Sequence, residues 1–181
     1  NALLQEPRQA PGRGDASIRH GAVSFDHVSF GYQPGHPILH DLQLAIPAGK
    51  FYGIVGHTGS GKSTLLSLLL RFYAPQQGSI RLDGIALDEI GDDAFRAGIG
   101  LVPQEPFLLA ASARENIDMG RGLSQQDIEA AARAAGVHEL ILALEHGYDT
   151  DMGESGTRLS SGQKQLIAIA RALAGRPKIL L

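Results

Sequence analysis

Two stretches near the start of the chain alternate apolar and polar positions. The first has apolar residues at Val23, Phe25, Val28 and Phe30, and the second at Leu42, Leu44 and Ile46. A period near two predicts half-buried β-strands, and the Gly/Pro-rich segment 31–37 between them predicts a turn. Two further strands are predicted over 79–82, before the tight turn Asp83-Gly84, and over 99–102, before Pro103.

The period changes to that of a helix in the second half of the chain. Ser124 predicts an N-cap, and apolar residues follow at i, i+3, i+4 and i+7, namely Ile128, Ala131, Ala132 and Ala135. A short helix over 138–145 and a Gly-rich loop over 147–157 are expected next. The last helix is expected to begin near Ser160 and to bury Leu166, Ile169, Ala170 and Leu173. Gly175 and Pro177 end it, and 178–181 then begins a buried strand.

A glycine-rich segment lies between an apolar run at 51–55, which predicts a short buried strand, and a predicted helix at 63–70. It reads Gly56-His57-Thr58-Gly59-Ser60-Gly61-Lys62-Ser63, with Thr64 next, and fits the P-loop pattern G-x-x-x-x-G-K-[ST]. Glycines allow backbone N–H groups to line an anion nest, and the following helix directs its positive end there. Lys62 can reach the β- and γ-phosphates of a nucleotide, and the Ser63 hydroxyl can ligate Mg²⁺.

Length, charge and cysteine content limit the kinds of protein that this chain can be. A chain of 181 residues predicts one domain, or one with a small lobe, and an apolar content of 43% suffices for a core. The net charge of −3 does not indicate a nucleic-acid surface. Cysteine is absent, which excludes disulfides and thiol catalysis and agrees with a reducing cytosolic setting. The apolar run 65–70 is too short to cross a bilayer.

A second motif narrows the family. Leu159-Ser160-Ser161-Gly162-Gln163 resembles the signature LSGGQ of ATP-binding cassette (ABC) ATPases. Phe30-Gly31-Tyr32 resembles the A-loop of that family, Gln104 stands where its Q-loop glutamine belongs, and 178–181 resembles the start of its Walker B strand. The segments occur in the family's order, and the resemblance covers residues 22–181.

The resemblance implies an α/β P-loop NTPase fold with an N-terminal antiparallel β-subdomain and a helical signature subdomain at about 105–160. Residues 1–21 are then a linker from an upstream transmembrane domain, and 22–181 form an incomplete nucleotide-binding domain. The family's Walker B aspartate, catalytic glutamate and switch histidine follow the Walker B strand. We therefore expect them beyond Leu181, together with the last strands of the sheet, and expect the chain to be a fragment of a longer protein.

The resemblance also assigns roles to residues. Tyr32 would stack on adenine, residues 56–64 would hold the phosphates of ATP, and Ser63 and Gln104 would contact Mg²⁺. Lys62 and Gln104 would act in catalysis, without a general base in this chain. Ser160, Ser161, Gly162 and Gln163 would contact ATP that is held by the P-loop of a second subunit. The family has glycine where this chain has Ser161; the serine could tune affinity or mark one site of a heterodimer.

Two segments are similar to those of exporters: Arg114-Glu115-Asn116-Ile117 and the X-loop-like Gly153-Glu154-Ser155-Gly156. The implied function is ATP-driven export by an ABC-type ATPase at the cytoplasmic face of the inner membrane. Its partners would be a second nucleotide-binding domain, as homodimer or heterodimer, and a transmembrane domain, with no nucleic acid. The alternatives are a nucleotide-binding fragment without hydrolysis, and a soluble ABC ATPase of DNA repair or translation. The compact span 104–159 disfavours the latter.

The remaining histidines and carboxylates singled out in the sequence are not expected to take part in catalysis. His57 fills a variable position of the P-loop, and His138 and His146 are expected to be solvated. Asp83 and Asp88 are expected to be turn residues. The resemblance assigns Glu154 to coupling with the membrane domain.

Overall fold

The computed structural model describes residues 16–153 and 159–181. The chain divides into two compact units, Asn1–Gly98 and Ile99–Leu181.

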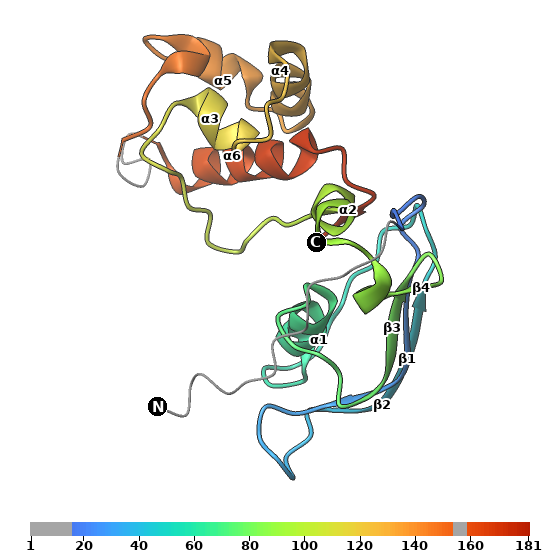
Figure 1. Cartoon of the computed structure of the whole chain (residues 1–181). Coiled ribbons are helices and arrows are strands. Elements are labelled where there is room, and N and C mark those ends of the chain that lie inside the picture. The colour runs from blue at the N-terminus through green and yellow to red at the C-terminus, as the bar shows by residue number, and fades with distance from the viewer. Residues whose placement is uncertain (1–15, 154–158) are drawn as a thin grey trace, which may run out of the picture. The chain divides into compact units, whose positions relative to one another are not determined.

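The first unit is built on a four-stranded antiparallel sheet with the order β2-β1-β3-β4 (Figure 1). The strands are β1 (Val23–Phe30), β2 (Leu39–Ile46), β3 (Gln77–Leu82) and β4 (Ile85–Ala86). Each apolar position predicted on the first strand is buried. Alternate side chains of a strand point to the same face, and the register shift between Phe25 and Val28 brings both pairs of apolar residues to that face. The predicted strands, the turn at 31–37 and the tight turn at Asp83-Gly84 are confirmed.

Helix α1 (Lys62–Leu69) lies beside this sheet, and η2 (Leu87–Glu89) and α2 (Asp92–Gly98) follow β4 (Figure 1). The helix predicted after the glycine-rich segment is therefore confirmed. Its buried side chains join the apolar face of the sheet to form the core of the unit, which includes Leu65, Leu68, Leu69, Phe25, Val28, Ile80 and Leu82. Burial of each of these side chains stabilises the unit by about 1.5–3 kcal/mol.

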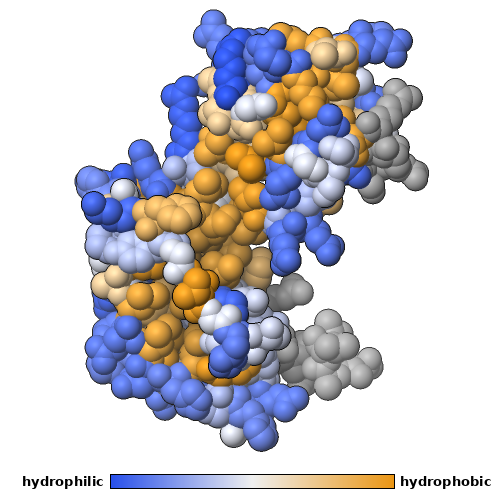
Figure 2. All heavy atoms as spheres, turned by 180° about the vertical axis from the view of Figure 1, so that it is seen from behind, coloured by the Kyte–Doolittle hydropathy of each residue, from blue (hydrophilic) through white to orange (hydrophobic). Residues whose placement is uncertain are grey.

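The predicted strand at 51–55 is wrong for this structure. The segment has no strand assignment, and Phe51 is 100% and Val55 92% exposed. Figure 2, which views the molecule from the side opposite to Figure 1, shows hydrophobic residues at the surface. A buried strand in a parallel sheet needs hydrogen-bonded neighbours at its edges. Among the described residues, the only parallel pair of named strands lies in the second unit, so this apolar run has no ladder to join within its own unit.

The second unit consists mainly of helices. They are α3 (Ala113–Asp118), α4 (Gln125–Ala134), α5 (His138–Leu142), η3 (Gly147–Asp149) and α6 (Ser161–Ala174). Helix α6 packs against α3 and α4 around an apolar core (Figure 1). Strands β5 (Ile99–Gly100) and β6 (Ile179–Leu180) pair in parallel. In the part of the chain that the structure describes, we find no helix with the length and apolarity that a membrane crossing requires.

Three details of this unit differ from the predictions, the first being that α5 ends at Leu142 and not at 145. Helix α6 buries Ile167, Ala168 and Ala170, whereas Leu166, Ile169 and Leu173 are partly buried at the edge of the core. Alanines share the most buried positions with Ile167, because α3 and α4 both pack closely against this helix. The strand after Gly98 is also shorter than the predicted 99–102, because its partner β6 pairs with only two of its residues.

Candidate functional site

The P-loop holds its lysine against its own backbone. The Lys62 ammonium donates hydrogen bonds to the carbonyl oxygens of Gly56 at 2.7 Å and His57 at 2.8 Å. It lies 3.4 Å from the Ser60 hydroxyl oxygen. These contacts close the loop into a ring around the lysine. The charged group is thereby held over the concave side of the loop, where an anion would meet it.

The N-terminus of α1 has no side-chain cap. Its N-cap is Gly61, in the left-handed conformation with φ 86°, and no side chain accepts a hydrogen bond from the first turn. Helix N-termini leave backbone N–H groups without intrahelical acceptors. Lys62, Ser63 and Thr64 form this first turn, with Thr64 buried and the Ser63 residue exposed. The turn therefore offers N–H groups, a hydroxyl and the positive end of the helix dipole to an anion.

At two glycines of the loop, a Cβ would require a neighbouring side chain to shift. A Cβ at Gly56 would lie 2.5 Å from the Ser60 hydroxyl, and a Cβ at Gly61 would lie 2.9 Å from Cδ2 of Leu39. Gly59 also has a positive φ, of 85°, although a Cβ there would meet no atom within 4 Å. The loop thus depends on glycine for close approach at two positions and for conformation at Gly59 and Gly61.

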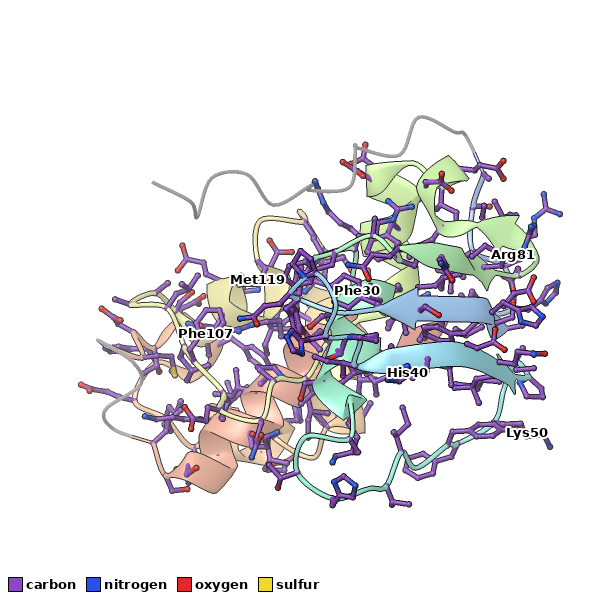
Figure 3. The ribbon with its side chains drawn as sticks, turned by 90° about the horizontal axis from the view of Figure 1, so that it is seen from below. Phe30, His40, Lys50, Arg81, Phe107 and Met119 are labelled. Atoms are coloured by element: carbon purple, nitrogen blue, oxygen red, sulfur yellow. The ribbon has the colours of Figure 1, made fainter. Side chains whose placement is uncertain are left out.

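Tyr32 lies on the hairpin turn between β1 and β2 and is 44% exposed. Its ring makes edge contacts with Phe30 at 5.2 Å and Tyr73 at 5.1 Å between centroids. Figure 3 shows Phe30 at one end of the sheet and Lys50 at the other. Because Gly61 packs against Ile38 and Leu39, the base of this hairpin also contacts the P-loop. The structure therefore brings the tyrosine-bearing hairpin and the phosphate-binding loop together within one unit.

The remaining loop positions are exposed, including His57, Thr58 and Ser60. The His57 ring Nδ1 lies 2.9 Å from the Thr58 carbonyl oxygen. This contact is local to the loop and gives the histidine no partner suited to catalysis.

The signature segment in the second unit is capped by its own side chains. The Ser160 hydroxyl accepts a hydrogen bond from the Gln163 backbone N–H at 3.2 Å, and the Gln163 side-chain oxygen accepts one from the Ser160 N–H at 2.8 Å. This reciprocal pair is a capping box. Ser161 and Gly162 stand between the two partners and are exposed. Their backbone N–H groups point out of the helix end, since the first N–H groups of a helix have no intrahelical acceptor.

Gln104 is exposed in the segment that leads from β5 to α3. Helix α6 holds this segment on both sides of the glutamine. The Gln165 side chain donates to the Pro103 carbonyl oxygen at 3.5 Å, and Arg171 donates to the Phe107 carbonyl oxygen at 3.1 Å. The helix that begins with the signature therefore anchors the loop that carries Gln104.

Arg171 and Asn116 form a network that the sequence patterns did not reveal. Asn116 is fully buried, and its side chain bonds the backbone of Leu109 and of the loop before α3. Arg171 donates to both the carbonyl and side-chain oxygens of Asn116, at 2.8 and 3.0 Å. Burial is the largest cause that lowers the pKa of Arg171, with the nearby Arg121 adding to it. The available signal was Arg171 inside the apolar stretch 166–174 of this helix.

His138 is buried, and the expectation that it is solvated is wrong. Its Nδ1 lies 2.8 Å from the Tyr148 hydroxyl, and Arg133 lies 3.2 Å from its Nε2. Helix α5 places the ring at the edge of the apolar core, where hydrogen bonds replace water. His146 is exposed, as expected.

Asp83 also does more than form a turn. Its carboxylate accepts hydrogen bonds from four consecutive backbone N–H groups, those of Arg19, His20, Gly21 and Ala22, at 2.7–3.2 Å. Burial alone would raise the pKa of Asp83, but these hydrogen bonds outweigh it and lower the pKa to about 2. A nest of amide donors in this unit thus stabilises an anion strongly.

The prediction for Glu154, together with Ser155 and Gly156 of the X-loop-like segment, lies outside the described residues. Among the described residues, no group of three or more histidine, aspartate and glutamate side chains could hold a metal ion.

Comparison with known proteins agrees with these motifs. The model of the family described as ABC transporter matches residues 39–181. The uncharacterized ABC transporter ATP-binding protein YwjA of Bacillus subtilis is 43% identical over 175 residues, covering 96% of this chain and 30% of the relative. ATP-binding cassette sub-family B member 6 of Homo sapiens is 40% identical over 177 residues, covering 97% of this chain and 21% of the relative.

A solved structure described as a bacterial Atm1-family ABC exporter with ATP bound matches with a TM-score of 0.86 and 40% identity. The match covers 99% of this chain and 32% of that chain. The predicted fold class, an ABC-type P-loop NTPase, is confirmed by this likeness. The chain spans about a third or less of the length of these relatives.

Proposed function

Because the chain belongs to the ABC transporter family, we propose that it binds ATP with Mg²⁺ and, in a longer protein, hydrolyses ATP to drive export across a membrane. The observation that carries the proposal is the P-loop itself. Lys62 is held by two loop carbonyls above an uncapped helix N-terminus. A triphosphate is the ligand class that suits this cluster of one ammonium group and several N–H donors.

The proposal gives separate roles in ATP binding to separate groups of residues. Residues 56–64 surround the phosphates, with Lys62 at the β- and γ-phosphates, and Tyr32 stacks on adenine. Ser63 and Gln104 would hold Mg²⁺, which would neutralise charge on the phosphate oxygens. Lys62 and Gln104 serve catalysis. The ATP named for the Atm1-family structure supports the choice of nucleotide.

Partners are part of the same proposal. Ser160, Ser161, Gly162 and Gln163 form a helix N-terminus with exposed N–H groups, which suits the γ-phosphate of ATP on a second nucleotide-binding domain. The two domains would pair head to tail and act with a transmembrane domain, at the cytoplasmic face of the membrane. The exporter named for the solved structure supports this assembly.

A lysine substitution tests the nucleotide site. We expect Lys62→Ala to weaken ATP binding to this chain by about 100-fold, because a charge-assisted contact is worth about 1.5–3 kcal/mol. Titration calorimetry with ATP and Mg²⁺ measures the affinity. Lys50→Ala is the matched control, since Lys50 is exposed at the other end of the sheet from Phe30 (Figure 3). Equal affinities for the two variants would refute phosphate binding at the P-loop.

A further inference from the structure

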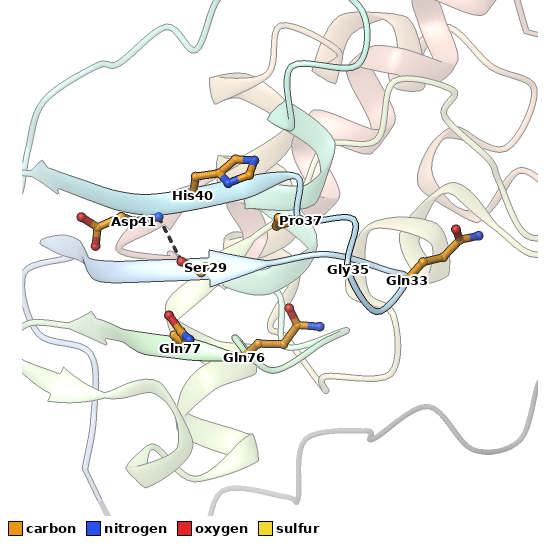
Figure 4. A pocket seen from close by; sticks show the side chains of 8 residues that line it. All are labelled: Ser29, Gln33, Gly35, Pro37, His40, Asp41, Gln76 and Gln77. Carbon is orange, nitrogen blue, oxygen red and sulfur yellow. Dashed lines mark hydrogen bonds between the residues drawn. The ribbon is translucent and has the colours of Figure 1, made fainter.

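One side chain fixes the backbone immediately before Tyr32. The Gln76 side-chain oxygen accepts a hydrogen bond from the Gly31 N–H at 3.1 Å, and its amide nitrogen donates to the Gly31 carbonyl oxygen at 2.9 Å. A single amide therefore satisfies both polar groups of Gly31. We call this pair of hydrogen bonds the Gln76 clasp. Figure 4 shows the Gln76 side chain directed toward the chain segment that joins Ser29 to Gly35.

The backbone around the clasp leaves little freedom. The Gln76 N–H donates to the Ser29 carbonyl oxygen at 3.0 Å, and the Ile38 N–H donates to the Phe30 carbonyl oxygen at 2.7 Å. A Cβ at Gly31 would lie only 2.3 Å from the His36 carbonyl oxygen. The two limbs of the hairpin thus press together at Gly31, and the clasp sets the orientation of the peptide groups that lead into Tyr32.

The same connecting segment also contacts the Tyr32 ring. Tyr73 lies three residues before Gln76, and its ring packs edge-on against Tyr32 and tilted against Phe30, at 5.1 and 5.5 Å between centroids. This segment follows α1, the helix that begins at the P-loop. Tyr32 is consequently held by its backbone through Gln76 and by its ring through Tyr73. Both contacts come from the segment that follows α1.

We propose that Gln76 is a positioning residue for the base of the nucleotide. The inference rests on the proposed binding of ATP with Tyr32 stacked on adenine. Stacking between a base and an aromatic ring contributes about 1–3 kcal/mol and depends on the two planes being parallel and in contact. Loss of the clasp frees the peptide groups before Tyr32 and weakens stacking. It leaves the phosphate contacts of the P-loop intact.

The experiment compares two ligands and two adjacent amides. Affinities of the 181-residue chain for ATP and for inorganic triphosphate are measured for wild type, Gln76→Ala and Gln77→Ala. Both glutamines line the same solvent-facing pocket (Figure 4), so neither truncation leaves a buried cavity. We expect Gln76→Ala to weaken ATP binding about three- to tenfold, as for the loss of one net hydrogen bond. We expect its triphosphate affinity to be unchanged, and Gln77→Ala to change neither affinity.

A Tyr32→Ala background separates positioning from general stability. If Gln76 acts through the ring, Gln76→Ala has no further effect on ATP affinity once Tyr32 is removed. Equal weakening of ATP and triphosphate, or an undiminished effect in the Tyr32→Ala background, overturns the inference. If Tyr32→Ala weakens ATP binding but Gln76→Ala matches Gln77→Ala, only this inference fails. If Tyr32→Ala leaves ATP affinity unchanged, base stacking in the proposed function fails with it.

Discussion

Two helix N-termini in this chain are proposed to bind phosphate, and they differ in how they are capped. At α1 the N-cap is Gly61, and no side chain accepts from the first turn. At α6, Ser160 and Gln163 complete a capping box. At α1, N–H groups without a side-chain acceptor and the helix dipole favour a bound anion, whereas at α6 the capping box already provides acceptors for two N–H groups. The comparison suggests a resident site at α1 and a docking surface at α6.

The glycines at the N-termini of α1 and α6 also have different structural roles. Gly61 has φ 86°, which favours glycine, and a Cβ there would lie 2.9 Å from Cδ2 of Leu39, whose side chain would have to shift. Gly162 lies within the first turn of α6, and a Cβ there would meet nothing within 4 Å. The α1 end is therefore shaped by its glycine, and the folded structure of the α6 end does not need one. Any requirement for glycine at position 162 would come from a bound partner.

The largest effect that tests this comparison is expected from alanine at the two glycines. Gly61→Ala should lower the free energy of unfolding by roughly 2–3 kcal/mol, since a left-handed alanine costs about 1–2 kcal/mol and the clash with Leu39 adds to it. Gly162→Ala should leave it unchanged or raise it by about 0.5–1 kcal/mol, because alanine favours helix. Urea unfolding of each variant measures both values. Similar losses of stability at the two positions would show that both helix ends depend on their glycine to the same extent.

Asp83 offers an internal measure of how strongly amide donors hold an anion. The lowered pKa of about 2 stabilises the folded state at pH values above the ordinary aspartate pKa of 3.8. As the pH falls below 3.8 the unfolded chain takes up a proton first, so stability is lost as the pH approaches 2.

We expect wild type to lose more stability than Asp83→Asn between pH 5 and pH 3, because an asparagine cannot titrate; full linkage would give about 1 kcal/mol, and solvent screening of this partly exposed carboxylate reduces the difference to roughly half of that. Urea unfolding at the two pH values gives the difference. Parallel losses in the two proteins would show that the N–H groups of 19–22 do not stabilise the carboxylate.

Local patterns predicted much of this structure. The strands β1 and β2, the N-caps Ser124 and Ser160 and the helix after the P-loop depend on residues close in sequence. The P-loop residues and their relation to Tyr32 could also be predicted, because a family pattern covers them. The proposed roles of these residues remain predictions.

Contacts between distant residues could not be predicted in this way. The apolar run at 51–55 indicates a strand, but periodicity does not specify a pairing partner, and the segment is exposed. The Gln76 clasp and the Arg171–Asn116 network join residues far apart in the chain. Likewise, His138 is buried because its partner Tyr148 lies on η3, and no local pattern encodes that contact.

The smallest expected effect concerns the cap of the signature helix. Ser160→Ala removes the hydroxyl that accepts from the Gln163 N–H, which should lower the free energy of unfolding by about 0.5–1 kcal/mol. Ser161→Ala is the matched control, because among the described residues the neighbouring hydroxyl makes no hydrogen bond, and we expect a change within about 0.5 kcal/mol. Thermal unfolding of the two variants without nucleotide compares them directly. If Ser161→Ala proved the more destabilising, the second serine would belong to the folded helix end, and its departure from the family's glycine would be structural.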